Sequence, residues 1–172
     1  MSNEVTTDSI DAIDPNHLGD DELYLLEVKY EMFPNQRTLL FKNKTHLVVW
    51  SDYLSKISKK IEYSQKEFPL MSLPWFIYTL VNEFWNYETD LSRPPGDVSE
   101  SALINEEKIG INPMRHCCAE NLFGYSFWNK SRKNNVSGLA PQSWEIPSYM
   151  LENGLLDQLK ELSTKLGLKS YL

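Results

Sequence analysis

The chain has 172 residues, of which 41% are hydrophobic and 12% are aromatic. This length accommodates one domain of ordinary size, and the apolar content excludes a chain that is disordered throughout. The formal net charge of −7 argues against binding to nucleic acid, which requires a basic face. An acidic surface serves either plain solubility or docking on a basic partner.

The first 21 residues contain five aspartates among small polar residues, and we expect them to form a flexible acidic arm before a single domain at residues 22–172. They lack the apolar core of a signal peptide, and no apolar run reaches the ~20 residues of a membrane-spanning helix. The two cysteines are adjacent and do not make a disulfide framework. These features indicate the reducing cytoplasm and no attachment to a membrane.

Three strands are expected to follow this arm. Apolar residues occur at every second position from Tyr24 to Met32, as a half-buried strand requires. The stretches RTLLF (37–41) and HLVVW (46–50) follow after short turn-like segments. The domain is therefore predicted to begin with a β-meander.

Two helices are predicted next. Ser51 can cap the first helix, and Pro69 ends it. Its apolar face would consist of Tyr53, Leu54, Ile57 and Ile61. The second helix begins at Ser72, and its apolar residues from Ile77 to Trp85 follow the helical repeat closely.

The second half contains a loop, three strand-like stretches and a helix. DLSRPPGDVSES (90–101) has the composition of a loop, whereas KIGI (108–111), MRHCCAENLFGYSFW (114–128) and SWEIPSYM (143–150) favour strands. A leucine stripe predicts a closing helix at about 153–166. The order of elements predicts an α+β fold, in which an antiparallel sheet packs with about three helices, and no internal repeat is apparent.

The stretch Arg115-His116-Cys117-Cys118 contains residue types that bind metals or act in catalysis. A structural zinc site needs about four ligands at suitable spacing, and these residues are consecutive. In a strand, His116 and Cys118 would share one face while Cys117 would point to the other. We therefore expect no metal and no cofactor here, and we expect the cysteines to fill the core of a hairpin.

A small cytosolic enzyme is the main alternative to a binding protein. It would use His46 or His116 as a base for the Cys118 thiol, or carboxylates that folding brings together. Adjacent acids such as Glu106-Glu107 are usually solvated surface. Phosphate-binding glycine loops and common hydrolase motifs are absent from the sequence, so we predict no enzymatic activity.

The segments LPWFIYTLVNEFW (73–85), GINPMRHCCAENLFGYSFWN (110–129) and SWEIPSYM (143–150) resemble the immunity proteins of bacterial contact-dependent inhibition systems. The resemblance covers mainly Leu73 to Met150 and assigns no residue roles. It implies a cytosolic, non-catalytic protein that binds one cognate toxin domain, often a basic nuclease, and covers its active or substrate-binding surface.

Acidic residues are the predicted contacts with such a partner, because opposite charges speed the encounter of two proteins. They are Asp20, Asp21, Glu22, Glu27, Glu31, Asp90, Asp97 and Glu100. Each of them also suits an ordinary solvated surface. A phage-encoded or regulatory adaptor that inhibits another host factor is a further alternative.

Overall fold

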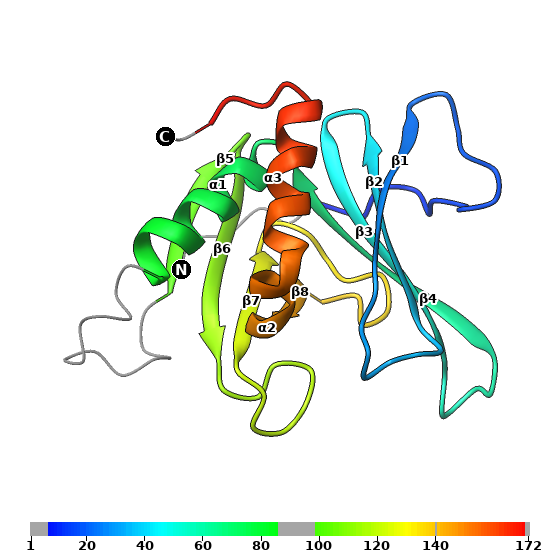
Figure 1. Ribbon diagram of the computed structural model, residues 1–172. Helices are drawn as coiled ribbons and strands as arrows, with labels where there is room; N and C mark the ends of the chain where they lie inside the picture. Colours follow the sequence, from blue (N-terminus) through cyan, green and yellow to red (C-terminus); the bar gives the residue numbers. More distant parts are fainter. Residues whose placement is uncertain (1–6, 86–98, 140, 171–172) are drawn as a thin grey trace, which may run out of the picture.

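The computed structural model of the chain describes residues 7–85, 99–139 and 141–170. Within these ranges the fold is α+β, and its strands form two antiparallel sheets of four strands each rather than the one sheet predicted (Figure 1). Strand order is sequential in both sheets, and a helical segment follows each sheet. The same order of elements therefore occurs twice, although the sequence shows no internal repeat.

The first sheet confirms the predicted β-meander and adds a fourth strand. Its strands are β1 (Glu22–Val28), β2 (Arg37–Asn43), β3 (His46–Leu54) and β4 (Ile61–Pro69). A bulge between Tyr24 and Leu26 interrupts the pairing of β1 with β2. The side-chain alternation predicted for β1 is therefore shifted at this point.

The helix predicted between Ser51 and Pro69 is wrong, because these residues complete β3 and form β4. Ser51 pairs with Ser64 across the hairpin. The alternation typical of a strand was hidden, since Gln65 and Glu67 occupy buried positions of β4 that apolar residues usually fill. The described residues accordingly contain two helical segments rather than about three helices.

The second sheet consists of β5 (Glu100–Ile104), β6 (Glu107–Met114), β7 (Gly124–Asn129) and β8 (Gln142–Pro147). The helix predicted from Ser72 is confirmed as α1 (Ser72–Thr79), which continues as a π-helical turn (Leu80–Phe84). The closing helix comprises α2 (Ser148–Met150), a wide turn (Leu151–Leu155) and α3 (Leu156–Lys165). It changes direction at Gly154, which has a φ of 117° that favours glycine.

One hydrophobic core joins the two sheets and both helical segments. The Phe76 ring of α1 lies with its centroid 5.5 Å from that of Phe68 in β4 and 4.5 Å from that of Phe127 in β7. Figure 1 shows α1 and α3 side by side over the second sheet. No helix among the described residues is both long enough and apolar enough to cross a membrane.

The two sheets meet where β4 lies next to β8. Side-chain amides, rather than a strand ladder, bond the backbone of β4 here. Glu67 N donates to Gln142 Oε1 at 2.6 Å, and Asn129 Nδ2 donates to Glu67 O at 2.9 Å. Asn135 Oδ1 accepts from Gln65 N at 2.8 Å. These amides satisfy backbone groups that an open strand edge would otherwise leave unpaired.

Residues 7–13, which the sequence predicted as part of a flexible acidic arm, lie against this junction. Ile10 N donates to Glu67 Oε1 and Ile13 N donates to Gln65 Oε1, each at 3.0 Å. Ile13 is buried on the other face of the first sheet. It packs in a small cluster with Leu39, Phe41, Val48 and Trp50. Side chains of β4 therefore hold this segment in place.

Candidate functional site

The Arg115–Cys118 stretch lies in a loop between β6 and β7, not in the strand that the sequence predicted. Cys118 has a left-handed φ of 63°, and Cys117 N donates to Leu122 O at 2.7 Å across the loop. The prediction that Cys117 and Cys118 point to opposite faces is therefore wrong, since it assumed that both residues lie in a strand. The two sulfur atoms and a Glu145 carboxylate oxygen all lie within 4.8 Å of one another.

The two cysteines have different surroundings. Cys117 is buried, as predicted for a core residue, and packs so closely on Gly124 that a Cβ there would lie 2.6 Å from its Sγ. Cys118 is only partly buried. Its backbone N–H donates to Glu145 Oε2 at 3.0 Å, and its Sγ lies 3.8 Å from Glu145 O. Glu145 is thus fixed beside the half-exposed thiol.

Cys118 is the more acidic of the two thiols. A hydrogen bond from the Cys117 thiol favours the Cys118 thiolate and so lowers the pKa of Cys118. The same hydrogen bond, together with burial, raises the pKa of Cys117. The ammonium of Lys66 also favours the Cys118 thiolate, although burial lowers the pKa of Lys66 to about 8. Cys118 is therefore the first of the two thiols to lose its proton.

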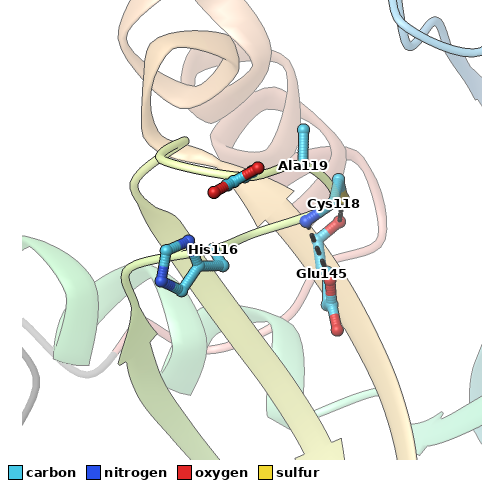
Figure 2. Close-up of a pocket in the computed structure, with 5 residues that line it drawn as sticks. His116, Cys118, Ala119 and Glu145 are labelled. Atoms are coloured by element: carbon cyan, nitrogen blue, oxygen red, sulfur yellow. Dashed lines mark hydrogen bonds between the residues drawn. The ribbon is translucent and has the colours of Figure 1, made fainter.

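Cys118 and Glu145 line an open surface depression, together with His116, Ala119 and Glu120 (Figure 2). Asn121 N donates to His116 Nδ1 at 3.0 Å, which leaves the proton of a neutral ring on Nε2. Figure 2 shows this ring at the opposite side of the depression from Cys118. No hydrogen bond in the described ranges joins the His116 ring to the Cys118 thiol, as a nucleophile and base require.

His46, the other base considered from the sequence, belongs to a separate buried network. Its Nε2 lies 2.7 Å from Glu107 Oε1 and 3.0 Å from Arg132 Nη2. Its Nδ1 lies 3.1 Å from Thr45 Oγ1. Both ring nitrogens thus have partners inside the network, and nothing in the described part of the chain links His46 to Cys118.

Glu107 is the centre of this network, so the expectation of solvated surface is wrong for it, whereas Glu106 is exposed. Arg132 Nε and Nη2 each donate to one carboxylate oxygen of Glu107 at 2.8 Å, and Asn129 Nδ2 donates at 2.6 Å. Burial raises the pKa of Glu107, but hydrogen bonds with His46, Arg132 and Asn129 outweigh it and lower this pKa to about 2. This satisfied carboxylate is suited to joining segments of the fold.

The predicted acidic contacts fall into separate groups. Five lie on or beside β1, an edge strand of the first sheet. They are Asp20, Asp21, Glu22, Glu27 and Glu31, of which Glu22 is partly buried and the others are exposed. Glu100 begins β5, an edge strand of the second sheet. Asp90 and Asp97 lie outside the described residues.

Two apolar side chains lie among these acids, and the sequence did not indicate their exposure. Leu23 is 54% exposed and Tyr24 is 48% exposed. The strict alternation predicted for this strand placed Tyr24 on the same face as Val28, which is buried. The bulge after Tyr24 breaks that relationship.

The acids along β1 differ in their own contacts. Asp21 pairs with Lys44 at 3.5 Å, and Glu22 accepts the Gly19 N–H at 2.8 Å. Within the described ranges, no hydrogen bond or ion pair engages the carboxylate of Glu27. This carboxylate is therefore available to a partner.

Comparison with protein-family models gives no match, and comparison with curated proteins also gives none.

Proposed function

We propose that the protein is a non-catalytic binding protein that neutralises a basic toxin domain, as immunity proteins do. One observation carries the proposal. The edge strand β1 presents exposed Leu23 and Tyr24 within a row of acidic residues. A partner that combines apolar and cationic groups is complementary to such an edge.

Aromatic and charged residues contribute to protein interfaces in different ways. An exposed tyrosine supplies a large contact area, and aromatic residues contribute much of the binding energy at interfaces. Acidic groups around it accelerate the encounter with a positively charged surface and disfavour pairing with a second acidic copy of this edge. β1 combines these elements in Tyr24 and its neighbours Glu22 and Glu27.

A nuclease toxin is the class of partner that best fits this surface. Nucleases bind phosphate backbones through basic clefts, and an acidic protein can occupy such a cleft by charge complementarity. Covering the cleft would block substrate binding without chemistry by the inhibitor. An adaptor that inhibits another basic host factor would use the same surface. The identity of the partner therefore distinguishes an immunity protein from such an adaptor.

The test uses a candidate toxin domain encoded by the adjacent upstream reading frame. The two purified proteins should co-elute in size-exclusion chromatography, and co-expression should abolish toxicity. The double variant Glu27→Lys/Glu31→Lys should slow association about 10-fold, with a weaker salt dependence. The matched control is Asp157→Lys/Glu161→Lys on the exposed face of α3, which should associate normally. Toxicity that survives co-expression, with no co-elution, would contradict the proposal.

A further inference from the structure

We propose that Cys117, Cys118 and Glu145 form a binding site for a thiophilic divalent cation, with Zn²⁺ as the ion they fit best. The proposal is independent of the function proposed above. Its basis is the convergence of two sulfur atoms and one carboxylate oxygen within 4.8 Å of one another. Ligands of a tetrahedral Zn²⁺ ion lie about 3.3–3.8 Å apart, given bond lengths of about 2.0–2.3 Å. Small side-chain rotations close the remaining difference.

The ligands come from a scaffold that holds them in register. Glu145 belongs to β8, in the middle of the strand, and Cys117 is packed on Gly124 at the start of β7. The left-handed backbone of Cys118 turns its sulfur toward that of its neighbour. Rigid strands and a constrained loop keep the ligands close, which lowers the cost of organising them around an ion.

The carboxylate is already oriented by a hydrogen bond of the kind that supports metal ligands. Cys118 N donates to Glu145 Oε2 at 3.0 Å, which leaves Oε1 free of that bond. Partners of this kind fix the orientation of a ligating carboxylate. A single residue, Cys118, thus supplies one ligand and positions another.

The charges also suit a divalent cation. Binding requires that each thiol lose its proton, which is released to solvent. Two thiolates and one carboxylate carry three negative charges, of which Zn²⁺ neutralises two. The ammonium of Lys66, which interacts with both Glu145 and Cys118, opposes the remaining charge.

Cys118 and Glu145 line the open depression in Figure 2, which leaves room for a fourth ligand beside them. His116 lines it but its Nδ1 accepts the Asn121 N–H, so the neutral ring carries its proton on Nε2 and does not offer that atom to a metal. We therefore assign the fourth position to water or to an external ligand, as in zinc sites with three protein ligands. Two sulfur ligands favour Zn²⁺, Cd²⁺ or Co²⁺ over Mg²⁺ and Ca²⁺.

The experiment titrates the reduced, metal-stripped full chain with Co²⁺ and then displaces the Co²⁺ with Zn²⁺. We expect one ion per chain, a thiolate-to-cobalt charge-transfer band and tetrahedral d–d bands. Cys118→Ser and Glu145→Gln should each weaken binding by more than the ~10–100-fold that loss of a supporting residue costs. His116→Ala is the matched control from the same depression and should bind Co²⁺ as the native chain does.

Thermal unfolding gives a second measurement that does not depend on colour. Zn²⁺ should raise the melting temperature of the native chain and of His116→Ala, but not of Cys118→Ser. Cys118 is the chosen cysteine because Cys117 is buried and its replacement would disturb packing. The proposal is overturned if Co²⁺ gives no charge-transfer band, or if Cys118→Ser and Glu145→Gln bind as tightly as the native chain.

Discussion

Arg132 and Glu107 form a buried bidentate ion pair. Nε of Arg132 donates to Oε2 of Glu107 and Nη2 donates to Oε1, both at 2.8 Å. The pair also reaches beyond the second sheet. Glu107 contacts His46 of the first sheet, and Arg132 Nη1 donates to Asp8 O in the N-terminal segment at 3.3 Å. One ion pair therefore connects three separate segments of the chain.

Replacement of Arg132 by methionine should destabilise the protein strongly. It leaves the Glu107 carboxylate buried without its cationic partner, and breaking such a pair costs about 3–5 kcal/mol. The control is Lys133→Met, which removes an exposed ion pair with Asp8 and should cost at most about 1 kcal/mol. Urea unfolding of both variants measures the difference. A loss below about 1 kcal/mol for Arg132→Met would show that the pair does not hold the junction together.

The stability of the native protein should fall in acid in a window set by Glu107. Its pKa is lowered from 4.5 to about 2 on folding, through hydrogen bonds that outweigh burial. The stabilisation is therefore fully present above pH 4.5 and is lost as the pH falls toward 2. Glu107→Gln removes this titration, so its unfolding free energy should depend less on pH across that window. Glu106→Gln, at the exposed neighbouring position, is the control for urea unfolding measured at several pH values.

The side-chain amide of Gln142 should contribute more to the free energy of unfolding than an ordinary surface hydrogen bond does. Its Oε1 accepts from Glu67 N at 2.6 Å, and its Nε2 donates to Glu67 Oε2 and Lys133 O, each at 2.8 Å. Gln142→Leu leaves the Glu67 N–H buried and unpaired, which costs about 1–3 kcal/mol, and it also removes a donor from Glu67 Oε2 and from Lys133 O. The exposed Gln158→Leu in α3 should change stability by at most about 0.5 kcal/mol. Equal stability of the two variants would contradict the role of amides at the β4 edge.

The sequence predicted the elements whose apolar residues follow a regular period. The helix from Ser72 was found in this way, whereas the strands through Phe41 and Trp50 were found as apolar stretches that follow turn-like segments. β4 was missed because its buried positions carry Gln65 and Glu67, whose partners come from segments far along the chain. Local periodicity contains no information about such long-range pairing, so it favoured a helix.

The candidate metal site was not predicted from the sequence, for a different physical reason. The Cys117-Cys118 pair was visible in the sequence, but its geometry depends on a left-handed residue that is not glycine. Such a conformation is rare in residues other than glycine, and the residue type at this position does not indicate it. Glu145, the third ligand, pairs with Ser126 in the register of β8 with β7 and lies far from the cysteines in sequence. The structure alone brings the three together.

The close contact between Gly110 and Trp128 gives a last prediction about packing. The two residues pair across β6 and β7, and a Cβ on Gly110 would lie 1.9 Å from Cζ2 of the indole. Gly110→Ala therefore forces the buried ring to move, and such overpacking costs about 1–3 kcal/mol. Gly19→Ala is the control, since its nearest contact would be an ordinary 3.6 Å to the side chain of Glu22.

A double variant separates the clash at this position from a general intolerance of alanine in β6. Trp128→Leu removes the ring and should itself destabilise the protein, because Trp128 is buried. If the clash explains the cost of Gly110→Ala, that cost should largely disappear in the Trp128→Leu background, as a double-mutant cycle measures. An unchanged cost in both backgrounds would mean that the Gly110 backbone, and not the indole, requires glycine.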